Sequence, residues 1–189
     1  MPDGSRMSAP VASSALLTVP NVITFARLCA VPLAVWLVLQ HRMEETFYLF
    51  LAAGISDGVD GWLARRGAGS ALGAILDPVA DKALLVSMFI TLAAVAALPD
   101  WLAILVVFRD IVIVGGVLVL AVTGQPVAIR PIFVSKLNTV MQIVLVATTL
   151  FLAGFAFSVP MLKTVLIWMV AATTLASGGA YVWNAARAR

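Results

Sequence analysis

Six long apolar stretches, each about the length of a membrane-spanning helix, alternate with short polar segments along this chain of 189 residues. Hydrophobic residues make up 62% of the sequence and charged residues only 11%, whereas about 25% of the residues in soluble domains are charged. A chain with so few charges cannot cover a water-exposed surface of this size. The pattern therefore predicts an all-α integral membrane protein with six transmembrane helices.

The bounds of the expected spans follow from the polar breaks between them. The spans cover residues 22–40, 46–64, 77–98, 101–122, 134–155 and 161–181. Residues 1–19 are polar to mixed and lack the basic-then-apolar layout of a signal peptide. They are expected to form a cytoplasmic tail, followed by one membrane domain over residues 20–186.

Lysine and arginine residues predict the orientation, because cytoplasmic loops carry an excess of them. With six spans, both chain ends lie on one side of the membrane. The cationic residues on that side are Arg6, Arg65, Arg66, Arg130, Arg187 and Arg189, and those of the opposite loops are Arg42 and Lys163. Both termini are therefore expected in the cytoplasm, with the chain in a bacterial inner or plasma membrane.

Four of the nine acidic residues fall close together beside apolar segments, namely Asp57, Asp60, Asp77 and Asp81. A carboxylate at bilayer depth costs several kcal/mol unless it is paired, hydrated or bound to metal. Four oxygen donors suit Mg²⁺ or Mn²⁺, and two such ions would offset the charge and still attract phosphate. The chain has one cysteine and one histidine, which makes a zinc site of Cys or His ligands very improbable.

Helical spacing groups these carboxylates into two pairs. Asp57 and Asp60 differ by about 60° around the second span, and Asp77 and Asp81 lie one turn apart on the third. Asp77 is expected to cap the third span, with Pro78 in its first turn. A short connection should make the two spans antiparallel neighbours, so that the pairs converge.

The residues around the carboxylates favour phosphoryl-type transfer. Two-metal sites stabilise the attacking and leaving oxygens of such reactions, and Arg65 can hold a diphosphate at the membrane edge. No serine or cysteine nucleophile with a base partner is apparent, which favours direct displacement with one aspartate as general base. The alternative is a cation or proton carrier, which predicts acidic groups at several depths. Only Asp110 lies deeper, and it should pair with the adjacent Arg109.

The pattern Asp-x2-Asp-Gly-x2-Ala-Arg at residues 57–65, followed by Gly-x3-Asp-x3-Asp at residues 73–81, resembles the signature of the CDP-alcohol phosphotransferases. The resemblance implies that the first three aspartates bind metal and that Asp81 is the general base and also contacts a metal. It also implies a pocket for the cytidine diphosphate group, formed by Gly61, Ala64, Arg65, Ser70 and Gly73. The connection between the two halves is one residue shorter than is usual in the family, which affects Ser70 more than the carboxylate pairs.

The reaction implied by this resemblance belongs to phospholipid biosynthesis. An acceptor hydroxyl attacks the β-phosphorus of a CDP-linked lipid, usually CDP-diacylglycerol, and CMP leaves. Residues 109–116 and 135–142 resemble the fourth and fifth spans of cardiolipin synthases, whose acceptor is phosphatidylglycerol. Residues 20–21 and 77–82 are also similar to phosphatidylglycerophosphate synthases, whose acceptor is glycerol 3-phosphate.

An anionic acceptor requires cationic groups, and the candidates are Arg109, Arg130 and Lys136. If Asp110 neutralises Arg109, less positive charge remains for the acceptor. That condition favours the monoanionic phosphatidylglycerol, with glycerol 3-phosphate as the alternative.

Other partners are less constrained by the sequence. No nucleic acid is expected, since the partners are membrane lipids and a polar or lipid alcohol. The glycine pairs at residues 115–116 and 178–179 could serve a homodimer, lipid contacts or close helix packing.

Overall fold

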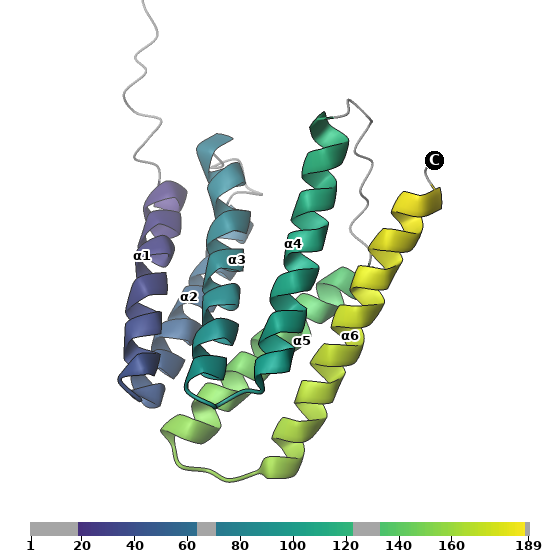
Figure 1. Ribbon diagram of the computed structural model, residues 1–189. Coiled ribbons are helices and arrows are strands. Elements are labelled where there is room, and N and C mark those ends of the chain that lie inside the picture. Colours follow the sequence, from purple (N-terminus) through teal and green to yellow (C-terminus); the bar gives the residue numbers. More distant parts are fainter. Residues whose placement is uncertain (1–18, 64–70, 123–132, 188–189) are drawn as a thin grey trace, which may run out of the picture.

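The computed structural model describes residues 19–63, 71–122 and 133–187, which form six helices and the short turns between them (Figure 1). Side chains are described in these ranges except at residues 19–23, 57, 59–63, 71–79, 81, 117–122 and 182–187. The helices are α1 (Val19–Leu39), α2 (Met43–Leu63), α3 (Ala71–Ala94), α4 (Asp100–Val122), α5 (Phe133–Gly154) and α6 (Pro160–Arg187). The predicted all-α class and the six helices are confirmed.

The start of α3 differs from the prediction. The helix begins at Ala71 instead of residue 77, so Asp77 and Pro78 lie inside it and the predicted cap at Asp77 is wrong. The preceding residues are rich in alanine and leucine, which are strong helix formers. A membrane helix tolerates an internal proline because neighbouring groups can satisfy the freed carbonyl. α6 also extends beyond its predicted end at residue 181, to Arg187.

The helices pack as a closed ring in the order α1, α2, α5, α6, α4, α3 and back to α1, and α5 also contacts α3 across the interior. The sequence predicted a direct contact between α2 and α3. In the described part of the chain, α2 packs mainly on α1 and α5, and α3 packs mainly on α1 and α4. α1 therefore forms the wall that joins the two aspartate-bearing helices.

Successive helices run in opposite directions, which gives the bundle two different ends (Figure 1). At one end, here called the terminal end, α1, α3 and α5 begin and α2, α4 and α6 end. The opposite end, here called the turn end, holds the connections between α1 and α2, α3 and α4, and α5 and α6. An even number of helices thus brings the start of α1 and the end of α6 to the same end of the bundle.

Short turns of one type close the turn end. The helices before them finish in left-handed residues that are not glycine, with φ of 57° at His41, 56° at Ala96 and 54° at Ala156. In each turn the next amide donates to the carbonyl five residues earlier, with N···O distances of 2.9 Å (Arg42 to Leu37), 2.8 Å (Ala97 to Leu92) and 3.0 Å (Phe157 to Leu152). This bond satisfies a carbonyl at the helix end, as in a Schellman motif.

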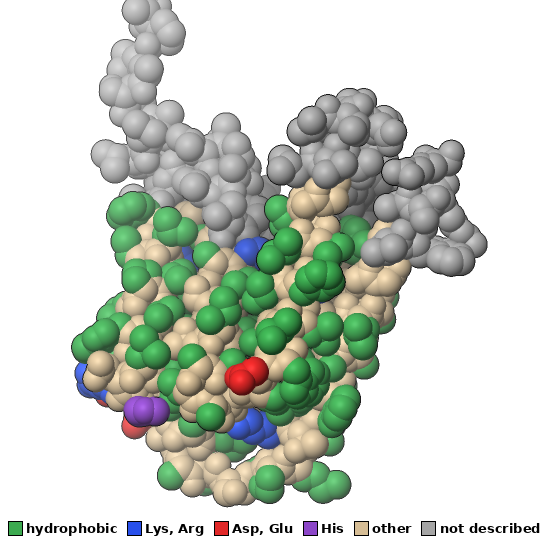
Figure 2. Space-filling view, in the orientation of Figure 1, with side chains coloured by type: hydrophobic (Ala, Val, Ile, Leu, Met, Phe, Trp, Pro, Cys, Tyr) green, Lys and Arg blue, Asp and Glu red, His purple; other side chains and the backbone are tan. Residues whose placement is uncertain are grey.

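The distribution of side chains is the inverse of that in a soluble protein. Large apolar side chains cover the outside of the ring, with exposed fractions of 69% at Ile104 and 64% at Trp168, and Figure 2 shows hydrophobic atoms spread over the visible face. Polar side chains, including Arg27 and Asn138, are buried instead. Soluble monomers rarely expose apolar surface on this scale, so the outer face fits a lipid environment.

Length and hydropathy agree with that environment. Among the described residues, the stretches 133–154 and 160–181 are long and apolar enough to cross a bilayer. The interior toward the turn end is filled by fully buried apolar side chains from three helices: Met88, Phe89, Leu92, Leu102, Leu145 and Leu150. This apolar half of the bundle fixes the helices whose other half carries the polar groups.

A close helix contact at the turn end depends on Gly154, the last residue of α5. A Cβ atom there would lie 2.7 Å from the Glu44 backbone nitrogen and 2.8 Å from its Cα. Around this contact the Phe47 ring packs on Phe151, with ring centroids 5.5 Å apart. The glycine therefore lets the start of α2 and the end of α5 meet backbone to backbone.

We expect Gly154→Ala to destabilise the protein by about 1–3 kcal/mol, because the added methyl group overpacks a contact with backbone atoms that cannot rotate away. The measurement is the thermal midpoint in detergent micelles, followed by tryptophan fluorescence. Gly179→Ala is the matched control, since a Cβ at Gly179 would meet nothing within 4 Å. Equal midpoints for the two variants would contradict the packing argument.

Candidate active site

The backbone places all four aspartates in helices that meet the terminal end. Asp57 and Asp60 lie in the last two turns of α2, and Asp77 and Asp81 lie in the first half of α3. Their side chains lie outside the described ones, so their convergence and metal ligation stay predictions. Among the side chains that are described, no group of three or more His, Cys, Asp or Glu residues could hold a metal ion.

The residues predicted to bind the nucleotide fall mostly in the same part of the chain. The backbone of Gly61 lies near the end of α2 and that of Gly73 near the start of α3. Ala64, Arg65 and Ser70 lie between these helices and outside the described residues, as does the acceptor candidate Arg130. Lys136, another acceptor candidate, is exposed in the first turn of α5.

Arg27 is a buried cation to which the sequence analysis assigned no role. Its exposed fraction is 3%, and Thr24, one turn earlier on α1, is also buried. α1 packs on both aspartate-bearing helices, so Arg27 lies in the wall that joins them. An arginine inside an apolar span is itself a signal for a functional or structural polar contact.

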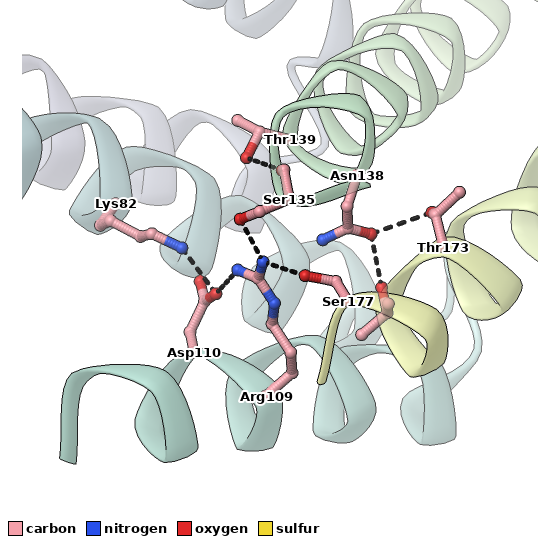
Figure 3. A network of polar contacts seen from close by, with 9 residues as sticks. Lys82, Arg109, Asp110, Ser135, Asn138, Thr139, Thr173 and Ser177 are labelled. Carbon is pink, nitrogen blue, oxygen red and sulfur yellow. Dashed lines mark hydrogen bonds and ion pairs between the residues drawn. The ribbon is translucent and has the colours of Figure 1, made fainter. Parts of the chain in front are cut away.

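Asp110 is the centre of the polar network that the structure describes in full (Figure 3). Its Oδ1 atom accepts a hydrogen bond from Lys82 Nζ at 2.5 Å and another from Arg109 Nη1 at 2.7 Å. The exposed fractions of the side chains are 10% for Asp110, 5% for Arg109 and 42% for Lys82. The predicted local pairing of Arg109 with Asp110 is confirmed, and Lys82 is a second partner that the sequence analysis missed.

Arg109 extends the network to the other helices. Its Nη2 atom donates to Ser135 Oγ of α5 at 2.6 Å and to Ser177 Oγ of α6 at 2.5 Å. The neighbouring Gly178 lies beside the arginine stem, since a Cβ there would be in van der Waals contact with Arg109 Cγ at 3.7 Å. One guanidinium and one carboxylate therefore join α3, α4, α5 and α6.

A row of polar side chains on α5 continues this network into the bundle. Asn138 Oδ1 accepts hydrogen bonds from Thr173 at 2.9 Å and from Thr174 at 2.8 Å, both on α6. Gln142 and Thr149 are also buried on α5. Their spacing of four and seven residues keeps them on one helical face, and this polar stripe in an apolar helix could have identified the interior face from the sequence.

The described network carries a net charge of +1, from Lys82 and Arg109 against Asp110. It also contains buried nitrogen donors without a hydrogen-bond partner among the described residues: Arg109 Nε, Asn138 Nδ2 and Gln142 Nε2. A network with net positive charge and spare donors suits a polar ligand that carries negative charge.

Comparison with protein families finds one match over most of the chain. The model of the CDP-alcohol phosphatidyltransferase family matches residues 17–176. This range contains both aspartate pairs, the ion pairs of Asp110 with Lys82 and Arg109, and most of α6.

Relatives named for cardiolipin synthesis and relatives named for a glycerol-3-phosphate acceptor have similar sequence identity to this chain. The chain is 33% identical, over 88% of its length, to a fusion protein of cardiolipin synthase (CMP-forming) and a mitochondrial hydrolase from Schizosaccharomyces pombe. It is 33% identical, over 87% of its length, to the chloroplastic CDP-diacylglycerol–glycerol-3-phosphate 3-phosphatidyltransferase 1 of Oryza sativa subsp. japonica. It is 30% identical, over 87% of its length, to the cardiolipin synthase (CMP-forming) of Rattus norvegicus. The chain spans 31%, 56% and 60% of the lengths of these three relatives.

We expect Asp110→Asn to destabilise the protein by about 3 kcal/mol, because the change leaves two cations without their shared counter-ion in a largely buried site. The thermal midpoint in micelles measures the effect. Glu45→Gln serves as the control, because it removes an ion pair with Arg42 in which both side chains are about half exposed, and exposed pairs contribute little. If the two variants lost stability equally, the network would not hold the helices together.

Proposed function

The chain belongs to the CDP-alcohol phosphatidyltransferase family, whose members are membrane enzymes of phospholipid synthesis. From this premise we propose that it transfers a phosphatidyl group from CDP-diacylglycerol to an acceptor hydroxyl, with release of CMP. The observation that carries the proposal is the pair of aspartate-bearing segments at the terminal end of the bundle, within the range that matches the family model.

The four aspartates have specific roles in the proposed reaction. Asp57, Asp60 and Asp77 hold one or two Mg²⁺ or Mn²⁺ ions, and Asp81 contributes to the same site, because these ions prefer carboxylate oxygens. The bound ions would supply charge neutralisation for the diphosphate of the donor. Asp81 accepts the proton of the acceptor hydroxyl as general base. Gly61, Ala64, Arg65, Ser70 and Gly73 line the pocket for the cytidine diphosphate group.

The side of α2 next to Asp57 offers space for such a donor. Gly54 and Gly58 stand about 60° and 100° from Asp57 around the helix, and a Cβ at either glycine would meet nothing within 4 Å. Within the described part of the chain, no group packs closely against that side of α2 at these two positions. This opening supports the entry of a large amphipathic substrate beside the carboxylates.

The proposed orientation puts the chemistry at the cytoplasmic face. All six helices cross the bilayer, with the terminal end in the cytoplasm, as the excess of arginine in its tails and loops predicts. The water-soluble part of the nucleotide then stays in the aqueous phase while the acyl chains remain in the membrane. A bacterial inner or plasma membrane is the proposed location.

The proposed acceptor is phosphatidylglycerol, which makes the product cardiolipin. Asp110 neutralises part of the positive charge of Arg109 and Lys82, and the reduced positive charge favours a phosphodiester with one negative charge over a phosphate monoester with two. Lys136 and Arg130 provide cations near the start of α5, with Arg109 behind them. Glycerol 3-phosphate is the second candidate, because a relative that is named for this acceptor is as similar as one named for cardiolipin synthesis.

The acceptor assignment predicts CMP release from CDP-diacylglycerol with phosphatidylglycerol but not with glycerol 3-phosphate. The measurement uses purified protein in mixed micelles with Mg²⁺, each acceptor being offered separately. Excess chelator should abolish release, and added Mg²⁺ should restore it. Release with glycerol 3-phosphate alone would replace cardiolipin synthesis by the second candidate, and activity that survives the chelator would contradict the metal site.

Asp81→Asn should lower kcat for CMP release by about 100-fold or more, because the amide cannot accept the proton of the attacking hydroxyl. Binding of CDP-diacylglycerol, measured by equilibrium titration, should change far less. Wild-type turnover in this variant would refute the general-base role. A folded wild-type protein that moved cations across vesicles without releasing CMP would instead support the carrier alternative.

A further inference from the structure

We propose that Lys82 binds the anionic phosphate of the acceptor, that Asp110 positions its ammonium group, and that Arg109 fixes Asp110 in place. The proposal deepens the phosphatidyl transfer proposed above and rests on it. It also replaces Arg109, one of the three predicted acceptor contacts, by a residue to which the sequence analysis gave no role.

The two terminal nitrogens of Arg109 are already engaged within the bundle. Its side chain is 5% exposed, and both of its terminal nitrogens already donate to described side chains on three helices. Binding a phosphate there would break hydrogen bonds that hold α4, α5 and α6 together. The guanidinium therefore has a structural role: it links the helices and fixes the position of the Asp110 carboxylate.

Lys82 is in the opposite situation. Its ammonium group has three donors, and the structure gives one of them to Asp110 Oδ1. Its side chain is 42% exposed, although its partner is nearly buried. The ion pair with Asp110 thus fixes the position of the Lys82 ammonium group and leaves its remaining N–H donors accessible.

The exposed part of Lys82 faces the bundle. Lys82 and Phe89 are seven residues apart on α3 and so differ by about 20° around the helix, and Phe89 is fully buried. A charge that faced hydrocarbon instead would be costly. The accessible donors are therefore expected on the side of α3 that faces the bundle.

The position of the Lys82 ammonium group favours a contact with the acceptor over a contact with the nucleotide. Its ammonium reaches α4 and the network that continues to Ser135 at the start of α5, next to the acceptor candidate Lys136. The residues proposed for the cytidine diphosphate group lie around the end of α2 and the start of α3. Because Lys82 directly follows Asp81 in the chain, the phosphate that it holds lies at nearly the same level along α3 as the proposed general base.

The test compares Lys82→Met with Lys82→Arg in the CMP-release assay. We expect the methionine variant to raise KM for the acceptor about tenfold or more, as the loss of a charged hydrogen bond does, while KM for CDP-diacylglycerol stays within about twofold. The arginine variant should recover most of the acceptor affinity, because it keeps the charge. Lys163→Met, at the turn end of α6, is the matched control and should leave both KM values unchanged.

A second measurement separates this proposal from the proposed function. Binding of short-chain phosphatidylglycerol, and separately of glycerol 3-phosphate, is titrated without CDP-diacylglycerol, so no turnover is needed. Loss of acceptor binding in Lys82→Met but not in Lys163→Met supports the proposal. Equal binding by both variants, no acceptor binding by the wild-type protein, or a KM change confined to CDP-diacylglycerol would overturn it.

Discussion

A carboxylate inside an apolar bundle must be neutralised, and Asp110 is neutralised by two cations at once. The cost of an unpaired charge at this depth is several kcal/mol, so the three side chains constrain one another. Because Arg109 also bonds to two serines, the same constraint fixes the spacing of four of the six helices. The remaining two, α1 and α2, attach through apolar packing and the backbone contact at Gly154.

The turn end of the bundle provides most of the packing that stabilises the fold, and the terminal end carries the residues proposed for the chemistry. Short hydrogen-bonded turns, packed aromatic rings and a fully buried apolar core hold the turn end. The aspartate-bearing segments, the exposed Lys136 and the longer connections belong to the terminal end. A rigid base of this kind lets side chains near the other end keep a fixed geometry while large lipid substrates enter and leave.

The sequence predicted the helices well because apolar length is a local property, and it failed where the answer depended on neighbours. The start of α3 was placed too late because Pro78 was taken as a first-turn residue. The pairing of Arg109 with Asp110 was predicted from adjacency, although adjacent side chains on a helix point about 100° apart and the long arginine has to bend back. The contacts with Lys82 and Ser177 join residues 28 and 68 positions from their partners. Such contacts follow from the ring order, which no local periodicity specifies.

The distribution of the ion pairs also bears on how the chain enters its membrane. Lys82, Arg109 and Asp110 all belong to α3 and α4, which one short turn joins into a hairpin. If this hairpin inserts as a unit, its charges are already paired before α5 and α6 arrive, and only the hydrogen bonds to Ser135 and Ser177 wait for the next hairpin. Biosynthesis then never has to place an unpaired Asp110 carboxylate in hydrocarbon at this site, and the last hairpin adds hydrogen bonds to ion pairs that have already formed.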